Sequence, residues 1–416
     1  MQQQAQAELY YFFSGSNKFY CKIDNDQLKT VAIIRTAPAH YAFITVRDGL
    51  DLKPELKDNV INLPSQVQLR RNDGKNDSSI GTYTLIGLQK NAFDGCTMLH
   101  EITLPPSVTS IGEGAFSGCT NLKNVKISRE IKYVEVNAFD GCDKLEKVNV
   151  MGNDSDNVSN YSSFYGILCK NGKIVFVPNM LNRSVLEIPT WVSGIAPNAF
   201  ANRKYLNSIK MLGVKTIEDG AFKNCEYLKQ VVLGNSLTTI GEGAFEECAE
   251  LETINLPSSL QAIKNRAFYN CLSIASVFLG MNLTEIGTSA FENCAAIKAI
   301  ALPKNLKYIG QDAFKNYYEL ESVTFSSPTN GLRTLSSGAF SFCSKLRELR
   351  LPIGLKYIET NAFLGCTALV RVMVNNDLES INRYAFMGCS NLTTINIPEQ
   401  TKTYDETFID CPRLNR

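Results

Sequence analysis

The chain has 416 residues, of which 44% are hydrophobic and 20% are charged, and its 42 basic and 41 acidic side chains give a formal net charge of +1. This apolar content excludes a disordered chain, and the balanced charge offers no broad field to nucleic acid or to an acidic membrane. No run of about 18 apolar residues is present, so the sequence predicts no transmembrane helix.

Residues 1–80 contain strand-like runs and no copy of the repeat that follows. The runs are Lys18–Ile23, Leu28–Arg35 and Tyr41–Val46, and turn-rich segments such as 71–77 (RNDGKND) divide them. A solenoid needs a cover for its open end, because an exposed strand edge invites aggregation. We therefore expect residues 1–80 to form a β-rich N-terminal cap, with a small separate domain as the alternative.

From about residue 81 the chain repeats, mostly with a period of 23 residues. Each unit carries Ala-Phe, usually a cysteine three residues after the Phe, an aliphatic residue three further on, and then an alternating run such as 251–257 (LETINLP). Such alternation predicts a half-buried strand. One unit cannot bury its own apolar positions, so stacked units must bury them together. The expected core ladder includes Phe116, Cys119, Phe245, Cys248, Phe268, Cys271, Phe291, Cys294, Phe363 and Cys366.

One spacing is irregular, because Phe139 and Phe200 are 61 residues apart, which is one period plus 38 residues. The excess lies at about residues 151–186. It contains Asn171-Gly172 between two apolar runs, which is a strong hairpin signal. We expect an irregular hairpin-containing insert, so that residues 81–416 form one solenoid of about 13 short repeats.

The repeat resembles that of the BspA-like leucine-rich repeat family of the bacterial-surface type. The likeness is clearest at 99–122 (LHEITLPPSVTSIGEGAFSGCTNL) and extends over about residues 83–414. It implies a β-rich solenoid of the α/β leucine-rich repeat class, a right-handed coil with a parallel β-sheet on its concave face. It also implies a cell-surface or secreted protein that binds host, matrix or other cell-surface proteins. A cytoplasmic location is the alternative.

The 13 cysteines raise the question of disulfide or metal chemistry. Eleven of them share one repeat position, which favours a column of buried thiols that act as small apolar side chains; the sequence leaves open whether any of them pair. There is no Cys-x-x-Cys pair and no Cys/His cluster, so we expect no metal and no cofactor. Asp154 and Asp156 could offer oxygen ligands to calcium, with a solvated turn as the alternative.

The outward side chains of the predicted strands are the candidate binding residues, because leucine-rich solenoids usually bind with this face. Lysines make the early units basic, and apolar residues around Phe278, the expected anchor, make the later units partly apolar. The alternative is a relaxed surface on which scattered apolar residues have no role. The candidates are Lys126, Lys147, Lys210, Val232, Asn255, Phe278, Ala301, Arg350 and Met373.

The two histidines, His40 and His100, are isolated, and no catalytic motif is present. We therefore expect no enzyme, but a protein-binding or adhesion module that is a monomer or a weak dimer. A carbohydrate-binding or accessory surface module and an intracellular scaffold are the alternatives. The expected partner is a protein, with a glycan as the alternative, and neither nucleic acid nor a membrane span is expected.

Overall fold

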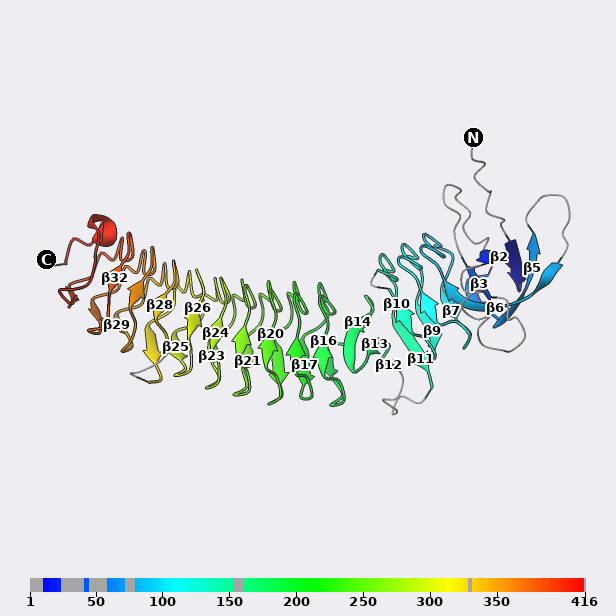
Figure 1. The fold of residues 1–416 in the computed structure, drawn as a ribbon, viewed down its shortest axis with the longest axis horizontal. Coiled ribbons are helices and arrows are strands. Elements are labelled where there is room, and N and C mark those ends of the chain that lie inside the picture. Colours follow the sequence, from blue (N-terminus) through cyan, green and yellow to red (C-terminus); the bar gives the residue numbers. More distant parts are fainter. Residues whose placement is uncertain are drawn as a thin grey trace, which may run out of the picture. The chain divides into compact units, whose positions relative to one another are not determined.

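The computed structural model describes residues 10–23, 41–44, 58–71, 79–135, 137–152, 160–327 and 331–414. The chain divides into two compact units: unit 1 is 1–172 with 176–182, and unit 2 is 173–175 with 183–416. β-strands account for almost all of the described secondary structure, together with one 3₁₀ turn, η1 (Asp405–Phe408), in the last coil (Figure 1). Within the described ranges, no helix has the length and apolar character to cross a bilayer.

Unit 1 begins with strands that close on themselves. Antiparallel pairs join β1 to β2, β2 to β3, β1 to β5 and β5 to β6, and a parallel pair joins β3 to β6, so these five described strands form a ring. Phe12 and Phe19 are buried and stack with ring centroids 5.1 Å apart. The strands are β1 (Tyr10–Ser14), β2 (Asn17–Ile23), β3 (Tyr41–Ile44), β4 (Val60–Asn62), β5 (Gln66–Arg71) and β6 (Ser79–Leu88).

Two parallel ladders run through the coils of unit 1, and both reach back into the N-terminal segment. One ladder follows the order β4-β7-β9-β11 and contains the longer strands of the coils. The other follows the order β6-β8-β10 and contains the two-residue strands of the coils. The N-terminal strands β4 and β6 thus supply the first rungs, which is the arrangement a cap requires; that residues 1–80 act as one stays a prediction. The coil strands are β7 (Glu101–Thr103), β8 (Ser110–Ile111), β9 (Asn124–Ser128), β10 (Tyr133–Val134) and β11 (Lys147–Met151).

The irregular segment of unit 1 contains an antiparallel hairpin made by β12 (Tyr161–Phe164) and β13 (Ile167–Lys170). Its turn places Tyr165 at φ 51° and Gly166 at φ 81°. The carbonyl of Gly166 accepts a hydrogen bond from the backbone N–H of Val148 in β11, at 3.0 Å. The hairpin therefore packs against β11, the last regular coil of unit 1, without joining its ladder. The backbone is again left-handed at Asn171 and Gly172, where the sequence predicted a turn.

Unit 2 repeats the two-ladder coil with little variation. In each coil a longer strand buries its central residue, and after a turn a strand of two residues buries its second residue. The longer strands are β15 (Val185–Glu187), β17 (Ser208–Met211), β19 (Gln230–Leu233), β21 (Thr253–Asn255), β23 (Ser276–Phe278), β25 (Ala299–Leu302), β27 (Ser322–Phe325), β29 (Glu348–Arg350), β31 (Arg371–Met373) and β33 (Thr394–Ile395). The shorter strands are β14 (Lys173–Phe176, whose last residue belongs to unit 1), β16 (Gly194–Ile195), β18 (Thr216–Ile217), β20 (Thr239–Ile240), β22 (Ala262–Ile263), β24 (Glu285–Ile286), β26 (Tyr308–Ile309), β28 (Thr334–Leu335), β30 (Tyr357–Ile358) and β32 (Ser380–Ile381).

The Ala-Phe dipeptides build a third set of contacts between coils. The backbone N–H of Phe245 donates to the carbonyl of Ala267 in the next coil at 2.8 Å, and the equivalent bond recurs along the unit. The Phe rings stack almost parallel, with centroids 5.3 Å apart for Phe245 and Phe268 and 5.0 Å apart for Phe268 and Phe291. These three rings have no exposed surface. Phe363 belongs to the same stack in unit 2, and Phe116 stacks in the same way on Phe139 in unit 1.

The repeated cysteine has a defined role in the stack. The carbonyl of Phe245 accepts a bond from the N–H of Cys248 in its own coil, at 3.2 Å, and a second from the thiol of Cys271 in the next coil, at 3.2 Å. The thiol therefore satisfies the second lone pair of a buried carbonyl, so it is a polar link between coils as well as a small apolar side chain. Cys119, Cys294 and Cys366 make the same bond to the preceding coil. All twelve cysteines whose side chains the structure describes are free thiols.

Candidate binding surface

The longer strands of unit 2 expose alternate side chains on one face, which we call the strand face. Period-2 alternation places the first and third residues of each strand outward and the second in the core. In β23, for example, Ser276 and Phe278 are exposed and Val277 is buried. Parallel pairing without register shifts then aligns equivalent residues of successive coils into columns, as for Asn255 opposite Phe278.

Five successive strands of this face carry no charge at all. From β19 to β27 the ten outward positions are exposed and uncharged. Exposed charged residues stand immediately before four of these strands, at Lys229, Glu252, Lys298 and Glu321, so the neutral surface is confined to the two outward columns of the strands. Soluble proteins usually place some charge at such exposed positions. We call these ten residues the neutral patch. They are Gln230, Val232, Thr253, Asn255, Ser276, Phe278, Ala299, Ala301, Ser322 and Thr324.

Phe278 stands at the centre of the neutral patch with 65% of its surface exposed. The next coil offers only the small side chains Ala299 and Ala301 beside it, so the ring projects above its neighbours on that side. The same coil also exposes Leu272 and Met281, in the turns on either side of β23, by about half of their surface. The described strands form no hydrogen-bonded ladder between β23 and β25, although their neighbours on either side are paired.

The three candidate lysines are divided between the two units. Lys126 and Lys147 belong to unit 1, whereas Lys210 belongs to unit 2. Lys126 makes an ion pair with Glu101 at 2.6 Å, and Lys210 makes one with Glu187 at 2.7 Å. Each pair joins neighbouring coils, so two of the three charges are balanced locally, which the sequence alone did not reveal. Lys147 is exposed, and the hairpin turn at residue 166 packs against its stem.

The strand face becomes charged beyond the neutral patch, on β29 and β31. The outward residues there are Glu348, Arg350, Arg371 and Met373, and Arg347 is exposed immediately before β29. Glu348 lies opposite Arg371 in the ladder, and Arg350 lies opposite Met373. Throughout the described residues, none of the three arginines has an ion pair within 4.0 Å.

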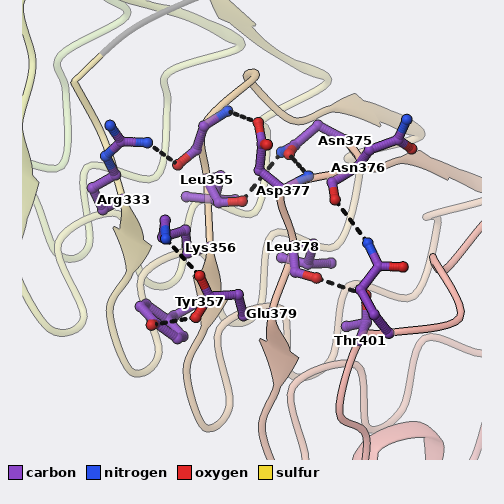
Figure 2. Close-up of polar contacts among 12 residues, drawn as sticks. Arg333, Leu355, Lys356, Tyr357, Asn375, Asn376, Asp377, Leu378, Glu379 and Thr401 are labelled. Atoms are coloured by element: carbon purple, nitrogen blue, oxygen red, sulfur yellow. Dashed lines mark hydrogen bonds and ion pairs between the residues drawn. The ribbon is translucent and has the colours of Figure 1, made fainter.

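Lys356 and Glu379, immediately before the shorter strands β30 and β32 of the same coils, are by contrast paired. Lys356 and the hydroxyl of Tyr357 in β30 both bind the carboxylate of Glu379 in the next coil, at 2.5 and 2.6 Å (Figure 2). These contacts lower the pKa of Glu379, with the Lys356 hydrogen bond as the largest cause, and the Glu379 contact raises the pKa of Tyr357. Arg333 donates to the carbonyl of Gly354 at 2.9 Å. This side of the molecule uses its charges to join coils.

Neither metal nor redox chemistry has a clear place on this surface. Within the described ranges, no three His, Cys, Asp or Glu side chains gather closely enough to hold a metal ion. Asp154 and Asp156, the calcium candidates, lie outside the described residues. The buried thiols are unsuited to nucleophilic work, since burial raises the pKa of Cys225 and Cys294 from 9.0 to about 12.

Comparison with known proteins is consistent with the repeat architecture. The family model described as "BspA type Leucine rich repeat region (6 copies)" matches residues 78–183, 172–298, 215–330 and 321–416. A leucine-rich repeat protein from Bacteroides ovatus has a similar solved structure, with 22% identity, a TM-score of 0.57, and 99% of this chain and 93% of that chain covered. A leucine rich cell surface protein from Faecalibacterium prausnitzii has 22% identity and a TM-score of 0.47, with 94% of each chain covered. No curated protein matches the sequence.

Proposed function

Since the chain belongs to the BspA-type leucine-rich repeat family, we propose that it is a non-enzymatic module that binds a protein partner through the strand face of unit 2. Repeat solenoids present extended surfaces that suit this use. We further propose that it acts at the cell surface or after secretion, as the family resemblance implies, and that a host, matrix or other cell-surface protein is the partner.

One observation carries the proposal: the neutral patch surrounds a projecting aromatic ring. Among the exposed phenylalanines of the described residues, Phe278 has the largest exposed fraction. Aromatic anchors surrounded by near-neutral contacts are typical of binding hot spots. An exposed phenylalanine adds nothing to the core, and its neighbours Ser276 and Ala301 add no charge for solubility. A partner that covers this patch would remove the exposed apolar surface from water.

The proposal is tested by a binding screen against purified extracellular-matrix proteins and a glycan array, with three proteins in parallel: the natural sequence, Phe278→Ala and Tyr308→Ala. Tyr308 is a matched control, because it is 48% exposed on the shorter strand β26, away from the strand face. We expect Phe278→Ala to fold normally and to weaken the binding of a matrix protein by about 2 kcal/mol, roughly 30-fold, and Tyr308→Ala to leave it unchanged. Equal binding by all three proteins, or binding to glycans alone, would contradict the proposal.

A further inference from the structure

We propose that the partner of the strand face is an acidic protein segment, one that places an apolar side chain against Phe278 and carboxylates against Arg347, Arg350 and Arg371. This inference rests on the proposed function and adds the chemistry of the partner. It combines two features of the same face, the neutral patch and the arginines that border it.

The three arginines have no acidic partner in the described structure, whereas about half of the other cations of unit 2 have one. Lys210, Lys264 and Lys345, for example, are each paired with a glutamate of a neighbouring coil. Arg350 and Arg371 instead point outward from the strand face without an ion pair in the described structure, although a carboxylate, Glu348, lies opposite Arg371 in the ladder. An arginine guanidinium binds a carboxylate through two parallel hydrogen bonds, so unpaired arginines suit a partner that brings its own carboxylates.

The spacing favours one continuous segment of protein. Phe278 lies on β23 and Arg350 on β29, three coils further along the chain and beyond the break in the ladder between β23 and β25. At about 4.8 Å per strand this separation is roughly 14 Å, which an extended peptide spans with about four residues. A sulfated glycan would satisfy the arginines but has no apolar group to cover the Phe278 ring. The juxtaposition therefore favours a polypeptide that is apolar at one end and acidic at the other.

The test uses a fluorescein-labelled synthetic peptide of twelve residues, with a tryptophan placed four residues before a run of four glutamates. Two further peptides replace the glutamates by glutamines, or the tryptophan by serine. Anisotropy titrations at 50 and 150 mM salt compare the natural sequence with the triple variant R347Q/R350Q/R371Q, with Glu348→Gln and with Phe278→Ala. The charge-matched control is K215Q/K304Q/K307Q, whose three lysines are exposed outside the longer strands.

We expect the arginine variant to bind the acidic peptide about 3- to 100-fold more weakly, since an exposed charge pair contributes roughly 0.2–1 kcal/mol. The loss should be larger at 50 mM than at 150 mM salt and absent with the glutamine peptide. Glu348→Gln should strengthen binding, and the lysine control should leave it unchanged. Equal losses in the arginine and lysine variants would overturn the inference, because net charge alone would then explain them.

Three further results test this inference, and the first of them separates it from the proposed function. If Phe278→Ala weakens binding of both the glutamate and the glutamine peptides while the arginine variant has no effect, the neutral patch binds protein but the acidic partner is refuted. Heparin that binds more tightly than the peptide, with no dependence on Phe278, would also overturn the inference, because a sulfated glycan would then be the better occupant. No binding of any of the three peptides would overturn it as well.

Discussion

The buried thiol column should make the fold unusually sensitive to alkaline pH. Burial raises the pKa of Cys225 and Cys294 from 9.0 to about 12, and raises those of Cys248, Cys271 and Cys366 well above 9.0. A folded thiol therefore keeps its proton at a pH at which the unfolded chain releases it. Stability from this source is complete below pH 9 and is lost as the pH rises from 9 towards the folded pKa.

The magnitude follows from proton linkage. Between pH 8 and pH 10, one thiol with an unfolded pKa of 9 and a folded pKa near 12 reduces the free energy of unfolding by about 1.4 kcal/mol. The two thiols of unit 2 with a folded pKa near 12, Cys225 and Cys294, together correspond to about 3 kcal/mol, which is a sizeable part of the stability of a typical domain. We expect urea midpoints, followed by far-UV circular dichroism, to fall steeply over this pH range.

A single substitution separates the thiols from the tyrosines and lysines that also titrate there. Cys225→Ala removes one buried thiol, together with its hydrogen bond to the carbonyl of Phe200. It should lower stability at pH 8, yet its further decline to pH 10 should be smaller than that of the natural sequence by about 1.4 kcal/mol. Identical declines in the two proteins, or a flat profile in both, would refute the reasoning.

Three further predictions concern the stacked coils of unit 2 and are measured by urea unfolding. Phe268→Leu removes two ring stacks and should cost about 1–3 kcal/mol, whereas Phe408→Leu alters the last coil, where the ring is 9% exposed, and should cost less; equal costs would contradict the stacking argument. Gly310→Ala brings a Cβ within 2.4 Å of a backbone nitrogen and should cost about 1–3 kcal/mol, whereas Gly331→Ala meets a lysine side chain at 3.1 Å and a backbone oxygen only at 3.7 Å and should be milder. Asn293 has φ 66°, so replacement by glycine should cost about 1 kcal/mol less than replacement by alanine.

The sequence predicted the stacked coils because each coil repeats the same few buried positions. The Phe, Cys and aliphatic columns are visible as letters in register, and apolar residues at a fixed period have few ways to be buried other than by stacking. The strand boundaries followed from short alternating runs such as 251–257, which contains β21. These features depend on local pattern alone, so a single sequence is enough to find them.

Other features depend on contacts between coils and were not predicted. The ion pairs Lys126–Glu101 and Lys210–Glu187 join residues 25 and 23 positions apart, and only an alignment of the outward columns for opposite charge would have suggested them. The same is true of the thiol bond from Cys271 to the carbonyl of Phe245. A residue's column can be read from one repeat, but its partner lies in the next.

The left-handed residues on either side of Ala-Phe were also missed, although they leave a signal in the sequence. The position two residues after the Phe is Gly or Asn in most coils, as at Asn270 and Asn293, and its φ is near 60°. Gly and Asn are the residues that adopt this conformation at least cost. Phe342 occupies the same position at φ 61° with its side chain over Gly365, a strained choice for which the fold offers no evident reason.

The composition of the neutral patch supports the binding role proposed above, because neither folding nor solubility accounts for it. If strand propensity had selected the outward residues, β-branched and aromatic side chains would dominate; instead, Asn255, Ser276, Ala299 and Ala301 lie around Phe278 on β21, β23 and β25. Solubility would favour charged residues, as at and beside the shorter strands, where charged residues form ion pairs between neighbouring coils. A partner can displace water from small neutral residues around one large ring at little desolvation cost, which is what a binding surface of this kind requires.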